Sequence, residues 1–131
     1  MTHFATRMLP VMRDTIAPDG SDVRVLLGVS AGGMAHFELG AAETSTAVMH
    51  RTVEEIWYLL SGRGEMWRKQ DEYEEVVSLE PGVCVTIPLG TRFQFRSLGS
   101  EPLRAVVVTA PPWPGNGEAV TVDGPWTPTV P

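Results

Sequence analysis

Two stretches of the sequence decide the fold: residues 50–64, HRTVEEIWYLLSGRG, and residues 82–93, GVCVTIPLGTRF. Each contains a short run rich in β-branched and aromatic residues, and each run meets a turn that contains glycine, at residues 61–64 in the first stretch and 88–90 in the second. Short runs of this composition between turn residues are typical of β-strands. Each stretch therefore predicts two strands joined by a tight turn.

The rest of the chain extends the same pattern. Thirteen glycines and eleven prolines are spread through 131 residues, so few windows are long enough for a helix. The expected strands cover residues 23–29, 34–39, 46–51, 55–60, 65–69, 74–78, 83–87, 92–96 and 103–109. Short strands at intervals of about ten residues predict an all-β sandwich or barrel.

The carboxyl-terminal segment, residues 110–131, has a different composition. Seven of the eleven prolines fall at or after Pro102, and proline lacks the donor that a central strand needs. The segment also carries Trp113 and Trp126. We expect one domain over residues 1–131, with a barrel core over about 23–109 and an extended tail whose indoles pack on the barrel or on a second subunit.

The composition limits which classes of molecule the protein can bind and in which cellular compartment it is expected. The formal charge of −6 repels phosphate backbones and anionic lipids, which disfavours nucleic acid and membrane as partners. The single cysteine, Cys84, excludes an intrachain disulfide, and its alternation with Thr86 predicts a small buried residue. We see no signal-peptide pattern and no apolar run of ~20 residues. The expected location is the cytoplasm.

Both stretches resemble the two conserved motifs of the cupin superfamily. The first cupin motif is HxH, three or four residues, Glu, six residues and Gly, and Glu55 and Gly62 keep the six-residue spacing. The second is Gly, five residues, PxG, two residues and His, and Gly82, Pro88 and Gly90 all match. The resemblance implies a double-stranded β-helix of the jelly-roll type, with a pocket for one small ligand.

In cupins, the histidines and the glutamate of these motifs hold a divalent metal, such as Fe, Mn, Ni or Zn. In this sequence, the positions of the four ligands are Val48, His50, Glu55 and Phe93. Valine and phenylalanine donate no lone pair to a metal. The resemblance therefore implies a reduced site of His50 and Glu55, and we leave open whether a metal is bound at all.

Glu55 and His50 are also the candidate catalytic residues. An ionised carboxylate in an apolar barrel would need a partner, and we predict an interior pair of His50 with Glu55, or a contact of Glu55 with Arg51 or Arg92. Such a pair could transfer protons without a metal. As further pocket residues, we name Trp57 and Trp67 at the cavity mouth, Phe93 at the lost ligand position, and His36 on an earlier strand.

The expected function is that of a barrel that binds a small organic molecule in its pocket. An enzyme is the first interpretation, of isomerase, cyclase or dehydratase type, because these reactions need only positioned acids and bases. The alternative is a metal-free cupin that binds or senses a ligand without converting it. We also expect a homodimer, formed through barrel edges or through the tail.

Overall fold

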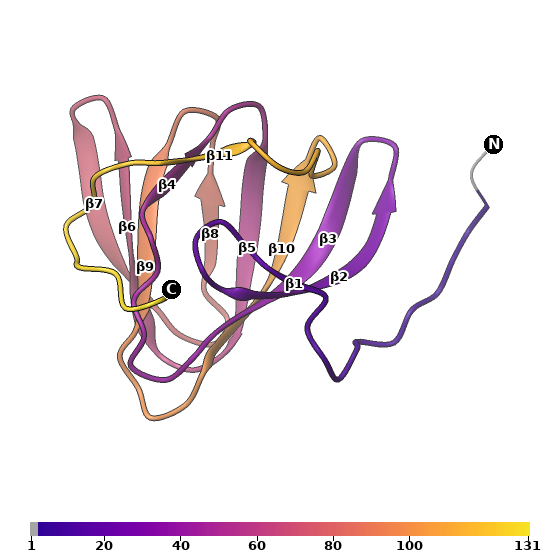
Figure 1. Ribbon diagram of the computed structural model, residues 1–131, viewed down its shortest axis with the longest axis horizontal. Helices are drawn as coiled ribbons and strands as arrows, with labels where there is room; N and C mark the ends of the chain where they lie inside the picture. Colours follow the sequence, from indigo (N-terminus) through magenta and orange to yellow (C-terminus); the bar gives the residue numbers. More distant parts are fainter. Residues whose placement is uncertain (1–2) are drawn as a thin grey trace.

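The computed structural model describes residues 3–131, and in this range it contains strands and turns but no helix. The all-β prediction is thus confirmed, and no helix in the described range is long and apolar enough to cross a membrane. The strands form two antiparallel sheets that face each other (Figure 1). Sheet A has the order β1-β2-β3-β10-β5-β8, and sheet B has the order β11-β4-β9-β6-β7.

The strands of sheet A are β1 (Thr15–Ile16), β2 (Asp22–Val29), β3 (Gly32–Leu39), β10 (Leu103–Ala110), β5 (Glu54–Ser61) and β8 (Cys84–Ile87). The strands of sheet B are β11 (Ala119–Thr121), β4 (Val48–His50), β9 (Arg92–Ser97), β6 (Gly64–Gln70) and β7 (Tyr73–Leu79). Both sheets mix strands from the two halves of the chain, which is the arrangement of a double-stranded β-helix.

The inner faces of the two sheets follow from the alternation along each strand. In β5, Glu55, Trp57 and Leu59 are buried, and the residues between them are exposed. The turn that follows requires glycine at Gly62, because φ is +85° and a Cβ would lie 2.5 Å from the Pro102 carbonyl oxygen. The inward residues form one core cluster, which consists of Leu39, Val48, Trp57, Leu59, Met66, Leu79, Val85, Ile87, Phe93, Phe95, Leu103, Ala105 and Val107.

Two details differ from the sequence prediction. The β6–β7 hairpin has a tip of only residues 71–72, because β6 runs to Gln70 and β7 already begins at Tyr73, so each strand is longer than its predicted range of 65–69 or 74–78. Cys84 is exposed. Val85 and Ile87 take the inward positions of β8, and a period of two places Cys84 on the opposite face.

The carboxyl-terminal tail packs on its own barrel. Its strand β11 pairs with β4 at the edge of sheet B. Further along, Gln94 donates to the Trp126 carbonyl oxygen (2.8 Å), and the Trp126 backbone N–H donates back to the Gln94 side chain (3.1 Å). The Arg96 guanidinium lies 4.1 Å from the centre of the Trp126 ring. These contacts bury Gln94 completely, although its place between Phe93 and Phe95 predicts an exposed side chain.

Candidate functional site

His50 and Glu55 both lie on inner faces of the barrel. His50 ends β4, two residues after the buried Val48, and Glu55 lies near the start of β5, two residues before the buried Trp57. The exposed fractions of His50 and Glu55 are 6% and 4%. The period of two in each strand is therefore enough to turn both side chains inward.

An acidic residue from the carboxyl-terminal tail holds the turn that joins these two strands. Glu118, from the tail, accepts hydrogen bonds from the backbone N–H groups of Thr52 (2.7 Å) and Val53 (3.2 Å), and from the Thr52 hydroxyl. Burial raises the pKa of Glu118, but these hydrogen bonds outweigh it and lower the pKa. An ionised Glu118 thus fixes the connection between His50 and Glu55.

Glu55 is paired with an indole and not with a cation. Its carboxylate oxygen accepts a hydrogen bond from Trp57 Nε1 at 2.9 Å. Burial raises the pKa of Glu55 to about 8, and this outweighs the Trp57 hydrogen bond, which lowers the pKa; the nearby Asp19 raises it further. Glu55 is therefore protonated at neutral pH, and the predicted contact with His50, Arg51 or Arg92 does not form.

His50 is enclosed by aromatic rings. The centre of its imidazole ring lies 5.2 Å from the centre of the Phe93 ring and 5.0 Å from the centre of the Trp113 ring. The interplanar angles are 83° and 78°, so both contacts are edge-to-face. Its Nδ1 is buried and has no hydrogen-bond partner among residues 3–131. Burial lowers the pKa of His50, although the Glu118 carboxylate acts in the opposite direction. His50 is therefore a neutral ring at neutral pH.

The residues at the cupin metal positions do not fit a metal ion. Val48 and Phe93 are cross-strand partners on the inner face, so two apolar side chains lie side by side where ligands would be needed. The Phe93 ring packs against His50, and Glu55 is neutral and bonded to Trp57. In the described range, no three His, Cys, Asp or Glu side chains come together as a ligand set.

We expect protein purified without a tag or chelator to carry far less than one equivalent of Fe, Mn, Ni or Zn. Elemental analysis measures this directly, with His50→Ala as the comparison, because a site built on the imidazole would lose its metal in that variant. Near-stoichiometric metal in the natural chain that disappears in His50→Ala would contradict the expectation.

His36 is not brought together with His50 and Glu55. It pairs with Arg24 on β2 and Val106 on β10, and Val106 pairs with the exposed Tyr58 on β5. Cross-strand partners share a face, and Tyr58 alternates with the buried Trp57, so this row lies on the outer face of sheet A. Burial and the Arg24 guanidinium hold the pKa of His36 below its usual range.

The two tryptophans expected at the cavity mouth also lie elsewhere. Trp67 pairs with Gln94 on β9 and with the exposed Val76 on β7, which places it on the outer face of sheet B beside the tail. Trp57 is only 1% exposed and lies at the centre of the core. Its ring contacts those of Phe37, Phe93 and Phe95, with centroid distances of 5.6, 6.3 and 4.9 Å. Aromatic side chains thus occupy the barrel interior around Trp57.

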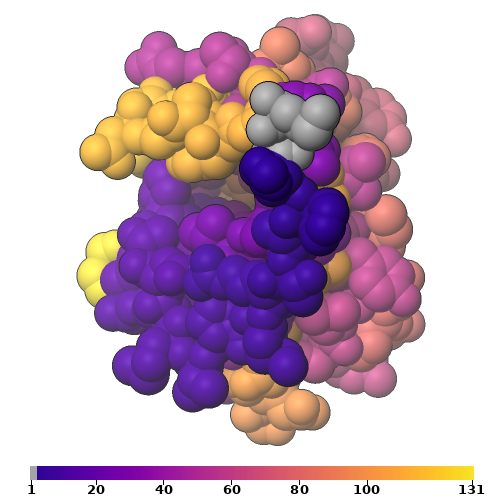
Figure 2. Space-filling view, turned by 90° about the vertical axis from the view of Figure 1, so that its right-hand side faces the viewer, coloured from indigo at the N-terminus to yellow at the C-terminus, as the bar shows by residue number. Residues whose placement is uncertain are grey.

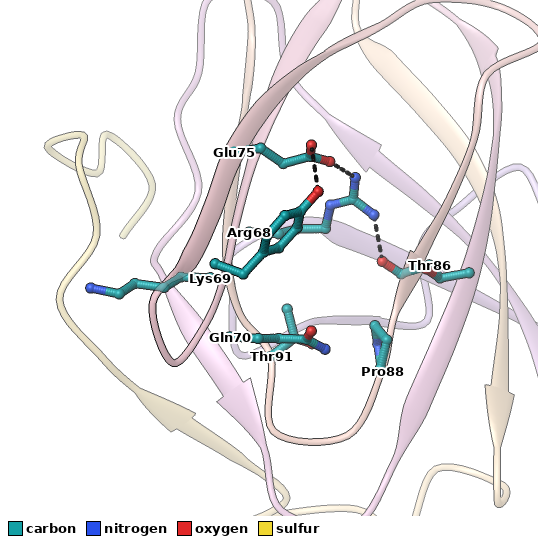
Figure 3. A pocket seen from close by; sticks show the side chains of 8 residues that line it. Arg68, Lys69, Gln70, Glu75, Thr86, Pro88 and Thr91 are labelled. Atoms are coloured by element: carbon teal, nitrogen blue, oxygen red, sulfur yellow. Dashed lines mark hydrogen bonds and ion pairs between the residues drawn. The ribbon is translucent and has the colours of Figure 1, made fainter.

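A polar cavity of about 240 Å³ lies at the end of the β6–β7 hairpin, where sheet B faces β8 (Figure 3). Its lining residues are Arg68, Lys69, Gln70, Tyr73, Glu75, Thr86, Pro88 and Thr91. In Figure 3 the Lys69 ammonium points away from the other side chains. We call this the mouth cavity. It adjoins the interior through Arg68, which is the cross-strand partner of Phe93.

Arg68 is the central group of the mouth cavity. Its guanidinium donates to the Glu75 carboxylate (2.7 Å) and to the Thr86 carbonyl oxygen (2.8 Å), so it ties sheet B to sheet A. Its Nε is buried and has no hydrogen-bond partner among the described residues. A second polar contact, from the Gln70 amide to the Thr91 hydroxyl (2.9 Å), lies beside it. The cavity therefore offers donors and acceptors with little net charge.

In the sequence analysis we did not name Arg68, Gln70 or Glu75 as pocket residues. One signal could have found them. Arg68 and Gln70 continue the alternation of the inward Gly64 and Met66, so they share the inner face of β6. Glu75 pairs with Arg68 in the register that a two-residue turn imposes.

Comparison with known proteins identifies the family. The model of the cupin domain matches residues 33–109, which is more than half of the chain. An uncharacterized protein of Methanocaldococcus jannaschii, MJ1618, is 30% identical over 104 residues that cover 75% of this chain and 79% of that protein. The chain belongs to the cupin superfamily.

Solved structures show the same fold. One is an uncharacterized conserved protein from Klebsiella pneumoniae with a double-stranded β-helix domain, which is 19% identical and has a TM-score of 0.69 over 92% of this chain and 100% of that one. Another is the Streptomyces protein PAC13 solved with uridine, which is 16% identical and has a TM-score of 0.68 over 91% of this chain and 92% of that one. At these identities, the likeness concerns the fold.

Proposed function

We propose that this cupin binds a small, polar, uncharged organic molecule in the mouth cavity and needs no metal ion to do so. The observation that carries the proposal is Arg68, which lines the cavity and whose guanidinium is held in place by Glu75 and the Thr86 carbonyl oxygen. A guanidinium that is already fixed in position loses little conformational freedom when it donates to a ligand oxygen, and hydrogen bonds to charged groups contribute ~1.5–3 kcal/mol.

The chemistry of the lining suggests the class of ligand. Among the described residues that line the cavity, Arg68 and Glu75 direct their charges into it, and the two charges neutralise each other. Tyr73 is 68% exposed, and its ring offers a stacking surface to a sugar or a planar heterocycle. A volume of about 240 Å³ is below the ~300–1,000 Å³ of typical ligand pockets. These features favour a hydroxyl- and carbonyl-bearing molecule of monosaccharide size, and the uridine bound to PAC13 has the same chemistry.

A proton-transfer enzyme is the second candidate. Glu55, with a pKa of about 8, keeps its proton at neutral pH and has the form of a general acid. An isomerisation, cyclisation or dehydration could use it if substrate reached the interior beside Trp113, whose indole covers His50 and is 38% exposed. This candidate requires the chain to open at that point, whereas binding in the mouth cavity does not.

The test of binding is thermal shift with uridine and neutral monosaccharides, followed by calorimetry on the compound that stabilises most. Arg68→Ala is expected to weaken its affinity by about 10- to 100-fold, because hydrogen bonds to charged groups contribute ~1.5–3 kcal/mol. The matched control is Arg104→Ala, which removes a similar ion pair, to Glu38 at 2.7 Å, remote from the cavity. Circular dichroism shows whether each variant is folded.

Equal affinity in the natural chain and in folded Arg68→Ala would exclude the mouth cavity as the binding site. Mass spectrometry of the bound compound separates the two candidates. A ligand recovered unchanged supports binding alone. Turnover that is lost in Glu55→Gln while affinity is kept supports the enzyme.

A further inference from the structure

On the outer face of sheet A, an arginine and a histidine lie side by side. Arg24 on β2 is the cross-strand partner of His36 on β3, and Val106 on β10 is the next residue of that row. His36 is only 4% exposed. Its Nδ1 and the Arg24 Nη1 are both buried, and neither has a hydrogen-bond partner among the described residues. A protonated imidazole would therefore add a buried N–H donor without an acceptor beside a guanidinium.

Arg24 also anchors the chain that precedes β1. Its guanidinium donates to the carbonyl oxygens of Pro10 and Val11, both at 2.9 Å. We call residues 10–14, which lead from this anchor to β1, the strap. Figure 2 looks onto this side of the molecule and shows the indigo amino-terminal segment in front of the body. The group that holds the strap is therefore the same guanidinium that lies beside His36.

The strap covers part of the edge of sheet A. Strand β1 pairs with only two residues of β2, so the strap takes over the pairing beyond them. The Asp14 backbone N–H donates to the Val23 carbonyl oxygen (2.8 Å), and the Asp14 carboxylate accepts from the Val25 N–H (2.7 Å). A bare edge strand presents backbone groups with which another chain can pair. Release of the strap would expose this edge.

The carboxylates on this side of sheet A are already paired with other cations. The ion pairs are Glu38 with Arg104 (2.7 Å), Asp22 with Arg13 (3.0 Å) and Asp14 with Arg7 (3.4 Å). Tyr58, which follows Val106 in the same row, supplies a phenol and no carboxylate. The Arg24 guanidinium donates instead to two backbone carbonyl oxygens. A positive charge on His36 would therefore meet a cation that no carboxylate of residues 3–131 holds in an ion pair.

These surroundings favour the neutral imidazole while the strap is closed. Burial is the largest cause that lowers the pKa of His36, Arg24 is the next, Arg104 acts in the same direction, and Glu38 opposes them. With the strap released, Arg24 is free to move and the imidazole meets water, so its pKa returns towards the usual 6.5. The closed strap is therefore fully stable above pH 6.5 and weakens as the pH falls below that value.

We propose that His36 is a pH-sensitive latch for the strap. Protonation of its imidazole repels the Arg24 guanidinium, which loses its hydrogen bonds to Pro10 and Val11, and residues 10–14 leave β2. The closed form prevails at neutral pH, and the open form, with the edge of β2 exposed, gains population in mildly acidic solution. The latch lies on the outer face of sheet A and does not depend on ligand binding in the mouth cavity.

Hydrogen exchange followed by NMR tests the latch in the full chain between about pH 7.5 and pH 5, a range in which ordinary carboxylates stay ionised. The reporters are the backbone amides of Asp14 and Val25, which bond across the strap contact. Each pKa unit between the open and closed states changes their equilibrium tenfold, so both protection factors are expected to fall at least about tenfold at the acidic end. In His36→Gln they should stay constant, because glutamine takes up no proton. The matched control is His3→Gln, which removes another histidine near the strap and should keep the natural response.

Constant protection of both amides in the natural chain overturns the proposal, and so does a pH response that survives in His36→Gln. The titration of the His36 ring, followed by NMR in the natural chain, keeps the test decisive if that variant folds poorly. The midpoint of the ring titration should coincide with the loss of protection. A His36 ring that takes up its proton while Asp14 and Val25 remain protected would refute the latch.

Discussion

Trp57→Ala is expected to lower the free energy of unfolding by about 3–5 kcal/mol, the cost of deleting a large aromatic side chain from a well-packed core. Trp57 is 1% exposed, and its ring contacts those of Phe37, Phe93 and Phe95. The substitution also removes the indole N–H that donates to Glu55. Because domains of this size are stable by only ~5–15 kcal/mol, this loss is a large fraction of the total stability.

Trp57→Phe separates packing from hydrogen bonding. Phenylalanine keeps most ring contacts but has no N–H, so the expected loss is about 1–3 kcal/mol for the unsatisfied buried acceptor and the smaller ring. Urea unfolding followed by circular dichroism measures both variants. The control is Trp113→Ala, since the Trp113 indole is 38% exposed and its loss should cost about 1 kcal/mol or less. Equal losses in Trp57→Ala and Trp113→Ala would refute the central role of Trp57.

Glu55→Gln is expected to stabilise the protein at alkaline pH. The pKa of Glu55 is raised from 4.5 to about 8 in the folded chain, so the folded state holds a proton that the unfolded state releases. The stability that this proton contributes is fully present below pH 4.5, declines as the pH rises, and is lost above about pH 8. At about 1.4 kcal/mol per unit, the shift corresponds to roughly 5 kcal/mol at most.

Glutamine cannot ionise and still accepts the Trp57 hydrogen bond. The expected result is a variant as stable as the natural chain below pH 4.5 and more stable by several kcal/mol above pH 8. Burial also raises the pKa of Asp19, so Asp19→Asn is the companion variant, and part of the pH dependence should persist in Glu55→Gln. A natural chain and a Glu55→Gln variant with parallel stability curves across this range would show that Glu55 is ionised in the fold.

The residue pattern alone predicted much of the architecture. The spacing from Glu55 to Gly62, and from Gly82 through Pro88 to Gly90, specifies turns. Each turn sets where one strand ends and the next strand begins. Alternation then assigns each residue to a face, which is why Glu55 and Phe93 were expected inside and are found there. Such local rules missed β1 and β11, which are held by pairing with strands that were already in place.

The sequence by itself determined which residues can face the interior, because alternate side chains of a strand share one face and because glycine and proline mark the turns between strands. Only the tertiary structure decided what those residues meet. Glu55 bonds to Trp57, Gln94 is covered by the tail, and Arg68 reaches Glu75 and a carbonyl of the opposite sheet. These contacts join residues that other strands bring together, and a buried group takes its charge state from all of its neighbours at once.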